Sequence, residues 1–368
     1  MDSVGLYIHI PFCEKKCLYC DFYSGKYSDE VKEKYVNELI SEIKSVGERA
    51  KNKKLKTAYI GGGTPSSLPP ELIEKIASAV YESFDNDIRE FTIEVNPNSN
   101  ADFGKYKEIG INRVSVGVQT LDDALLKKIG RLHDSAEALR CLDEAGKYFD
   151  NVSTDLIIGL SENQDVKRDL SLILDRVKHL SAYMLKVEEG TPLQKLILDK
   201  TVSVATENTV IKQYEEVVQT CEDKGLMRYE VSNFARSGYE SKHNSSYWNM
   251  TDYYGVGVAA HSYVDGSRYY NSANIDAYIN GLHSGNSSQI TEREYSVTDD
   301  KEEYVMLALR TCKGLSLKNY RNRYNEDFIV AYATNLNRIK NYIYIGNGYV
   351  RIKEKFILVQ NSIISELI

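Results

Sequence analysis

Three cysteines close to the N-terminus constrain this chain more than any other feature. Cys13, Cys17 and Cys20 lie in the segment YIHIPFCEKKCLYCDFY, with three residues between the first pair and two between the second. Such closely spaced sulfur donors suit an iron-sulfur cluster or a soft metal ion better than disulfides. Structural zinc takes four protein ligands. Three ligands leave one coordination position open for a cofactor or substrate.

A zinc site is the alternative at these cysteines, and His9 is the nearest fourth donor in the sequence. His9 lies within the alternation Leu6, Ile8, Ile10, which predicts a strand that runs into the cysteine loop. The sequence therefore favours a cluster over a zinc ion.

Composition limits the class of protein and its partners. With 368 residues and 42% hydrophobic content, the chain can form one large domain and a smaller one. It has no run of about 18 apolar residues and no signal-peptide pattern, so we expect a cytoplasmic protein. A net charge of −7 argues against nucleic acid as the main partner.

Strand-like and helix-like segments alternate over the first two thirds of the chain. After the Leu6–Ile10 strand and Thr57–Ile60, strands are predicted at Phe91–Val95, Arg113–Val118, Val152–Ile158, Ala182–Val187 and Arg228–Val231, with helices at Ala136–Tyr148, Asp165–Val177 and Glu207–Lys224 between them. Six or seven βα units with a parallel sheet follow, whereas a closed barrel needs eight. We predict an α/β fold with a partial, open (β/α)6 barrel.

Polar residues gather where the predicted strands end, which is the edge at which parallel α/β sheets bind ligands. Glu94, Gln119 and Asp155 end or lie in strands, and Arg131 follows in the segment IGRLHD. The turn Gly61–Pro65 (GGGTP) follows another strand and allows the backbone to approach a small ligand closely. Each residue alone could be a cap or a surface ion pair, but four at successive strand ends favour a binding site.

The cysteine spacing, with Tyr19 before the last cysteine, resembles the signature of the radical S-adenosylmethionine (SAM) superfamily. The resemblance implies a 4Fe-4S cluster held by Cys13, Cys17 and Cys20, with SAM chelating the fourth iron. It also implies a set of SAM-binding residues: Tyr7, Tyr19, Gly62, Gly63, Thr64, Glu94, Gln119, Arg131 and Asp155.

The order of YIHIPFC, GGGTP, IEVNP, SVGVQTL, GRLHD and STDLIIGL resembles the branch that contains oxygen-independent coproporphyrinogen oxidases and HemW heme chaperones. Oxidases of this type carry a further cysteine two residues after the third ligand, where this chain has Phe22, and an N-terminal extension, whereas this chain begins six residues before Tyr7. Both features favour a chaperone that carries heme to heme-accepting proteins such as respiratory cytochromes. Peripheral membrane contact and a homodimer are left open.

The segment His243–Trp248 matches the HNxxYW motif of HemW-like proteins. The resemblance implies heme binding by His243 and Trp248, because imidazole is a common axial ligand and an aromatic ring can flank the macrocycle. The alternative is that both residues anchor a domain junction. His261 is a weaker second candidate for a heme ligand.

The pattern changes near Tyr295. Helices are predicted at Glu302–Arg310, Leu317–Arg323 and Phe328–Tyr342, followed by a hairpin of Tyr349–Ile352 with Phe356–Val359. These elements predict a small winged-helix-like α+β domain. The expected organisation is a barrel at 1–232, a connecting region with the HNxxYW motif at 233–294, and the C-terminal domain at 295–368.

Two other functions stay open from the sequence. One is the oxidase itself, which decarboxylates two propionates of coproporphyrinogen III to give protoporphyrinogen IX. The other is a radical SAM enzyme that modifies heme, such as a ring-opening methyltransferase. Formation of protoporphyrin or of a linear tetrapyrrole would distinguish them from a chaperone.

Overall fold

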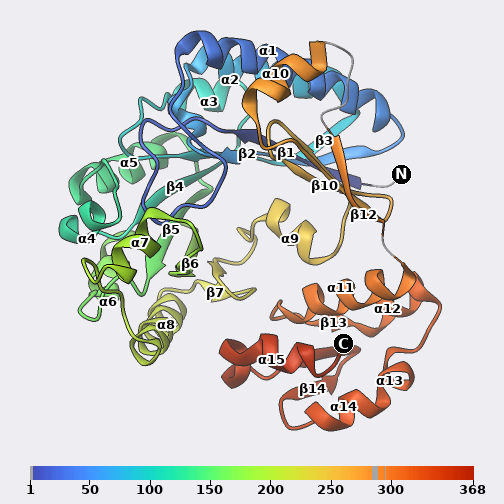
Figure 1. The fold of residues 1–368 in the computed structure, drawn as a ribbon. Coiled ribbons are helices and arrows are strands. Elements are labelled where there is room, and N and C mark those ends of the chain that lie inside the picture. The colour runs from blue at the N-terminus through green and yellow to red at the C-terminus, as the bar shows by residue number, and fades with distance from the viewer. Residues whose placement is uncertain (1–2, 284–288, 295) are drawn as a thin grey trace.

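The chain folds around one open, curved sheet whose consecutive central strands are parallel. The computed structural model describes residues 3–283, 289–294 and 296–368. The central strands are β1 (Ser3–Ile10), β2 (Lys54–Gly62), β3 (Asn86–Val95), β4 (Arg113–Gln119), β5 (Val152–Ile158) and β6 (His179–Met184). They pair in chain order and in parallel. The predicted partial barrel of six βα units is thereby confirmed (Figure 1).

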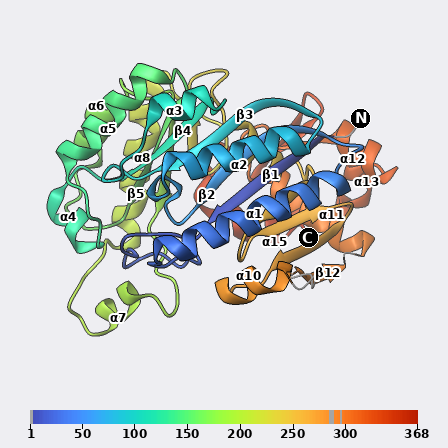
Figure 2. The same cartoon turned by 90° about the horizontal axis from the view of Figure 1, so that it is seen from above.

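Helices cover the outer, convex face of this sheet, as Figures 1 and 2 show for α1, α2 and α3. In α1, Tyr35, Leu39 and Ile43 are fully buried and recur at helical spacing, and the side chain of Ser28 caps the first turn. The helices of the barrel are α1 (Asp29–Arg49), α2 (Pro70–Ser83), α3 (Phe103–Glu108), α4 (Asp123–Lys128), α5 (Ser135–Tyr148), α6 (Val166–Ile173), α7 (Pro192–Leu198) and α8 (Glu207–Asp223).

The two faces of the central strands differ in polarity. In β4, the valines at 114, 116 and 118 are buried in the hydrophobic core under the helices. The alternate residues Arg113, Ser115 and Gly117 lie on the opposite, concave face. This alternation places polar side chains inside the barrel.

Two predicted strands of the barrel differ from the observed ones. The strand predicted at Ala182–Val187 begins earlier, at His179. The sequence does not predict this start, because the polar inward residues His179 and Ser181 interrupt the hydrophobic pattern. The prediction of a parallel barrel strand at Arg228–Val231 is wrong. The strand found there is the two-residue β7 (Met227–Arg228), which pairs antiparallel with β8 (Asn233–Ala235), while β8 pairs antiparallel with β6.

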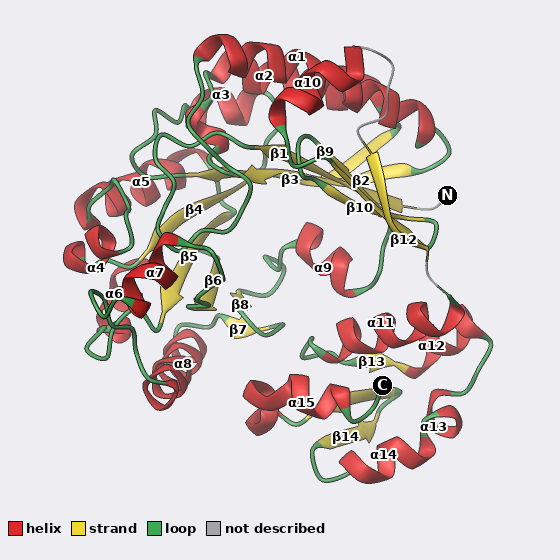
Figure 3. Ribbon diagram, in the orientation of Figure 1, coloured by secondary structure: helices red, strands yellow, loops and turns green. Residues whose placement is uncertain are grey.

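The region after β8 extends the sheet beyond β1. It contains α9 (Lys242–Trp248), β9 (Tyr253–Val256), β10 (His261–Val264), β11 (Ser267–Asn271), α10 (Ile275–His283) and β12 (Gln289–Glu294). Strand β9 pairs in parallel with β1, and β10 to β12 follow it antiparallel to their neighbours. The sheet order is β12-β11-β10-β9-β1-β2-β3-β4-β5-β6-β8-β7 (Figure 3). The described residues of the predicted connecting region, 233–294, therefore supply β8 next to β6 and β9 to β12 beyond β1.

The C-terminal part forms a separate small core around Val305, Tyr320 and Val350. It contains a three-stranded antiparallel sheet of order β13-β15-β14. Its elements are α11 (Val297–Leu309), β13 (Leu315–Ser316), α12 (Leu317–Tyr324), α13 (Phe328–Ala331), α14 (Ala333–Ile339), β14 (Ile343–Gly346), β15 (Tyr349–Ile352) and α15 (Gln360–Ser365).

Two predictions in this part are wrong. The helix predicted at Phe328–Tyr342 is divided into α13 and α14 at Tyr332, whose φ and ψ of −106° and 18° leave the helical region. The hairpin pairs β15 with β14 instead of with Phe356–Val359, which lies in a 3₁₀ helix. Asn347 and Gly348 both have positive φ, as a two-residue type I′ turn requires.

The proposed boundary at Tyr295 lies outside the described residues, and the three-part division stays a prediction. Within the described part of the chain, no helix has the length and apolar character needed to cross a bilayer.

Candidate functional site

The carboxyl ends of the central strands surround a cavity of about 480 Å³. It is lined by all three cysteines of the N-terminal motif and by eight residues of the predicted SAM set: Tyr19, Gly62, Gly63, Thr64, Glu94, Gln119, Arg131 and Asp155. These residues come from positions 13 to 155 and meet because parallel strands end at the same edge. The structure thus brings together the residues predicted for the cluster and for SAM, with Tyr7 as the exception, whereas His243 and Trp248, predicted for heme, do not line this cavity.

The cysteine loop is held to its neighbours by backbone hydrogen bonds. The Cys13 amide donates to Gly25 O at 2.9 Å, and the Leu18 amide donates to Ile129 O at 3.0 Å. Burial raises the pKa of the Cys20 thiol to about 11, so a bound metal would have to stabilise its thiolate. Among the described residues, no three His, Cys, Asp or Glu side chains lie close enough to hold a single metal ion. In an iron-sulfur cluster each cysteine binds a different iron, so the three sulfurs can lie further apart than the ligands of a single ion.

The glycine turn after β2 packs directly against the cysteine loop. The Gly63 amide donates to Ile10 O at 2.8 Å, and the Thr64 amide donates to Phe12 O at 2.7 Å. A Cβ at Gly63 would lie 3.1 Å from Cys13 Sγ. Gly62 has φ of +114°, which favours glycine. The glycines therefore let the turn pack against the cysteine loop and His9, and they line the cavity beside the three thiols. Backbone and sulfur donors of this kind fit a cluster that carries a small polar ligand.

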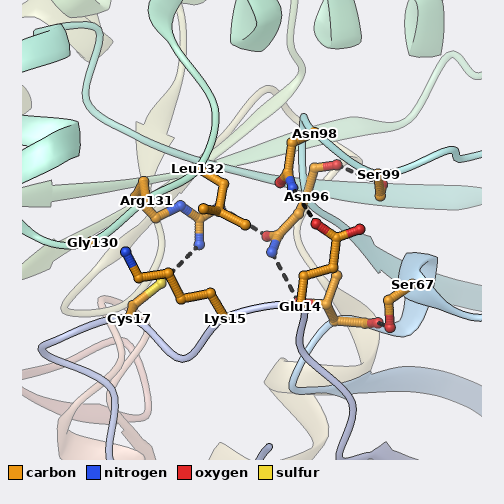
Figure 4. Close-up of a pocket in the computed structure, with 11 residues that line it drawn as sticks. Glu14, Lys15, Cys17, Ser67, Asn96, Asn98, Ser99, Gly130, Arg131 and Leu132 are labelled. Atoms are coloured by element: carbon orange, nitrogen blue, oxygen red, sulfur yellow. Dashed lines mark hydrogen bonds between the residues drawn. The ribbon is translucent and has the colours of Figure 1, made fainter. Parts of the chain in front are cut away.

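Arg131 connects the cysteine loop to the strand ends (Figure 4). Its Nη1 lies 3.6 Å from Cys17 Sγ, and its Nη2 donates to Asn96 Oδ1 at 2.8 Å and to Gly117 O at 2.7 Å. Asn96 in turn donates from Nδ2 to Thr64 Oγ1 at 2.9 Å. Sequence reasoning missed Asn96 as a site residue, although its position directly after a strand, in IEVNP, was a signal for it.

Two carboxylates face the cavity from neighbouring parts of the sheet. Glu94 accepts hydrogen bonds from the Tyr59 hydroxyl at 2.7 Å and from the Gly62 amide at 3.1 Å. Burial nevertheless raises the pKa of Glu94 to about 7. Asp155 accepts from Ser115 Oγ at 3.4 Å, and burial raises its pKa as well. Gln119 ends β4 with φ of 69°, a conformation that is uncommon for a residue other than glycine.

Tyr7 is half-buried in β1 and does not line the cavity. Its hydroxyl is 3.1 Å from His9 Nδ1, and its ring stacks at 6.2 Å on Tyr59. The other nitrogen of His9, Nε2, lies 2.9 Å from Tyr23 O, and the side chain is 6% exposed. His9 therefore has both nitrogens engaged away from the cysteines, which gives no support to it as a fourth metal ligand.

His243 is buried in the barrel. Nδ1 lies 2.9 Å from Thr57 Oγ1, Nε2 lies 2.7 Å from the Tyr247 hydroxyl, and the ring stacks at 5.2 Å on Tyr59. The residue is 1% exposed, and burial lowers the pKa of its imidazole to about 4. In this arrangement α9 is anchored to β2 by the histidine of the HNxxYW motif, and neither ring nitrogen is free for an iron.

The other two candidates for heme contact lie nearer the surface. Trp248 is half-buried, and its Nε1 has no hydrogen-bond partner in the described part of the chain. His261 is exposed at the start of β10 and stacks at 5.1 Å on Tyr270. Heme contact by His243, Trp248 or His261 stays a prediction.

Comparison with known proteins identifies relatives along nearly the whole chain. Residues 7–173 match the model of the radical SAM superfamily. The chain is 35% identical to the heme chaperone HemW of Bacillus subtilis, over 86% of each chain. It is 33% identical to the heme chaperone HemW of Lactococcus lactis, over 94% of this chain and 92% of the relative. Among solved structures, coproporphyrinogen III oxidase (HemN) from Escherichia coli, described as a radical SAM enzyme, matches 100% of this chain and 90% of its own at 19% identity and a TM-score of 0.85, which shows a common fold.

Proposed function

Because the chain belongs to the HemW family of the radical SAM superfamily, we propose that it is a heme chaperone that binds heme and transfers it to acceptor hemoproteins in the cytoplasm or at the membrane surface. The observation that carries the proposal is the identity of about one third to HemW chaperones over nearly the full length of the chain. Membership of the superfamily implies a 4Fe-4S cluster and SAM.

We assign the cluster to Cys13, Cys17 and Cys20 and SAM to the residues that line the same cavity. Glu94 and Asp155 would accept hydrogen bonds from ribose hydroxyls, and Arg131 would bind a carboxylate with donors that remain on its guanidinium. The backbone of Gly62 and Gly63 would approach the amino group. When bound, the cluster supplies a low-potential electron to SAM. In this proposal the cluster and SAM together have a structural, gating or release role in heme transfer.

The rim of the cavity supports a chaperone more than a coproporphyrinogen oxidase. The position at which the oxidases of this branch carry a further cysteine is occupied by Phe22, whose side chain is 63% exposed. Tyr183 and Met184 lie on the same rim and are 43% and 38% exposed. Exposed apolar side chains beside a cavity are typical of a site for an apolar ligand or partner. A porphyrin face is a ligand of this kind.

Hemin titration of the reconstituted protein tests the chaperone proposal. We expect wild type to bind hemin, and we expect His243→Ala to weaken binding at least about tenfold if imidazole coordinates the iron. Because the Tyr247 hydroxyl occupies Nε2, Tyr247→Phe should then retain or strengthen binding. The titration is followed by the absorption spectrum of the heme.

Thr57→Val is the matched control, since it removes the hydrogen bond to His243 Nδ1 and leaves the imidazole in place. A similar loss of affinity in Thr57→Val and His243→Ala would show that the histidine acts through packing. Equal, tight binding by wild type and His243→Ala would exclude His243 as the ligand. Failure of wild type to bind hemin would refute the chaperone proposal itself.

The pKa of Glu94 predicts a pH dependence of SAM binding. A carboxylate accepts hydrogen bonds from hydroxyls and attracts the positive sulfonium, whereas the protonated acid does so poorly. Because the pKa is about 7, SAM affinity should rise between pH 6 and 8 and fall by up to about tenfold per unit below pH 7. Calorimetric titration at several pH values measures this, and Glu94→Gln should remove the step. A wild-type affinity that is constant from pH 6 to 8 would contradict the role of Glu94.

A further inference from the structure

Arg113 is a buried cation on the concave face of the open barrel, and it has no ion pair within 4 Å in the described part of the chain. It is 1% exposed and is among the largest fully buried side chains. Its Nε has no hydrogen-bond partner among the described residues. A buried charge without a partner is costly. Its presence therefore calls for an explanation beyond packing.

Arg113 lies on the same face of β4 as a residue that lines the cavity. It is the first residue of β4 and lies on the same concave face as Ser115, two residues later, which corresponds to about 6.6 Å along the strand. Ser115 pairs with Glu94 of β3 and donates to Asp155 of β5. The long side chain of Arg113 thus lies one layer beneath the two carboxylates of the cavity.

The neighbour of Arg113 on β3 is Thr92, which is fully buried and whose Oγ1 has no hydrogen-bond partner among the described residues. Two adjacent polar side chains are therefore unsatisfied at this layer. Ordered water is the usual partner of such groups inside proteins. A water-filled layer would leave the charge of Arg113 available to act on the groups above it.

The charge of Arg113 acts on both carboxylates. Burial raises the pKa of Glu94 and of Asp155, and Arg113 opposes this rise at both residues. The other titratable or charged groups around Glu94, Asp155 and Arg113 come from the cysteine loop, β1, β2, β3, β6, α9, and segments next to β4 and β7. They are Tyr7, Tyr19, Tyr59, Arg131, His179, Tyr183, Tyr229, His243 and Tyr247, together with two buried carboxylates, Glu90 of β3 and Glu230. Among them Arg131 is a second cation, and it acts on Asp155.

We propose that Arg113 is a positioning residue for SAM: from beneath the cavity it holds negative charge on Glu94 and Asp155, so that both carboxylates accept hydrogen bonds from the cofactor. The inference rests on the proposed location of SAM in this cavity. Arg113 itself does not line the cavity, and its effect on SAM passes through the two carboxylates.

SAM affinity measured from pH 6 to 9 on the reconstituted protein tests this role. Arg113→Met keeps the length of the side chain and removes its charge, and Arg113→Gln is a second neutral variant. We expect both to move the midpoint of the pH dependence upward by about one unit and to weaken binding about tenfold at pH 7. Arg113→Lys restores the charge and should return the midpoint toward that of wild type.

Two further variants separate this effect from a structural one. Arg228→Gln changes another buried arginine, which pairs with Glu354 away from the cavity, and should leave the midpoint unchanged. In a Glu94→Gln background, Arg113→Met should shift the pH dependence much less than in wild type.

Two results would overturn the inference. One is a midpoint in the neutral variants equal to that of wild type. The other is a loss of affinity that is the same at every pH and is not restored by lysine, which would show a structural role. Wild type that contains its cluster and binds no SAM at any pH would instead refute the proposed cofactor site, together with the inference that rests on it.

Discussion

Cys17→Ser should abolish cluster binding, and SAM binding with it. The remaining two cysteines cannot hold three irons of the cluster, and the Arg131 guanidinium, now 3.6 Å from Cys17 Sγ, would lose its sulfur neighbour. We expect the iron content after anaerobic reconstitution to fall at least about tenfold, and SAM affinity to fall below detection because the metal supplies its anchoring position. Iron analysis, electron paramagnetic resonance and calorimetry on one sample measure both effects.

Cys141→Ser is the matched control for this experiment. Cys141 lies in α5, apart from the N-terminal motif, and burial raises the pKa of its thiol to about 12, so it is not a ready metal ligand. This variant should retain the iron and SAM binding of wild type. Retention of wild-type iron in Cys17→Ser would contradict the assignment of the cluster, and a fully protein-ligated zinc ion in oxygen-free wild type would do the same.

Glu90→Ala should be strongly destabilising, because Glu90 holds α9 in the barrel. The carboxylate is 1% exposed and accepts hydrogen bonds from Ser241 Oγ at 3.1 Å, the Lys242 amide at 2.8 Å and the His243 amide at 3.0 Å. Its removal leaves two buried donors, Ser241 Oγ and the His243 amide, and one partly buried donor, the Lys242 amide, without this acceptor. We expect the free energy of unfolding to fall by about 3–5 kcal/mol. Urea denaturation followed by circular dichroism measures the change.

Glu74→Ala provides the comparison for a surface carboxylate. Glu74 pairs with Lys105 at 2.9 Å, with 43% of its side chain exposed, and its loss should cost less than about 1 kcal/mol. Glu90→Gln keeps an acceptor oxygen, so its loss of unfolding free energy should lie between those of Glu90→Ala and Glu74→Ala. If the free energy of unfolding falls by less than about 1 kcal/mol in Glu90→Ala, α9 is held in the barrel by packing and the carboxylate contributes little.

The sequence predicted those parts of the fold whose signals are local. The strands that end at Val95, Gln119 and Ile158 are hydrophobic runs that contain a polar residue, Glu94, Gln119 or Asp155, and the structure places these three side chains around one cavity. The start of β6 and the antiparallel pairing of β7 were not predicted, because inward-facing polar side chains such as His179 remove the hydrophobic pattern. The β14–β15 hairpin carried a local signal, the Asn347-Gly348 turn, and was missed because Phe356–Val359 is a more hydrophobic segment.

Residues that act inside the barrel could not be predicted from the chain. His243 belongs to a motif that suggests a heme ligand, yet its contacts are to Thr57 and Tyr247, and the first of these is 186 residues away. Arg113 and Glu90 have no local pattern that separates them from surface charges. Their burial follows from which strand face points inward and from the entry of α9 into the barrel, and both depend on the complete sheet.

The amino-acid sequence by itself predicted the cofactor chemistry, because the cysteine spacing and the glycine turn through which the chain resembles the radical SAM superfamily are properties of short segments. It also determined the order of the βα units, since their periodicity is local. Only the tertiary structure decided which charges are buried together: Arg113 beneath Glu94 and Asp155, and Glu90 under α9. The physical reason is that burial and electrostatic coupling depend on distances between side chains from different strands, and these distances exist only once the strands have paired and the sheet has curved.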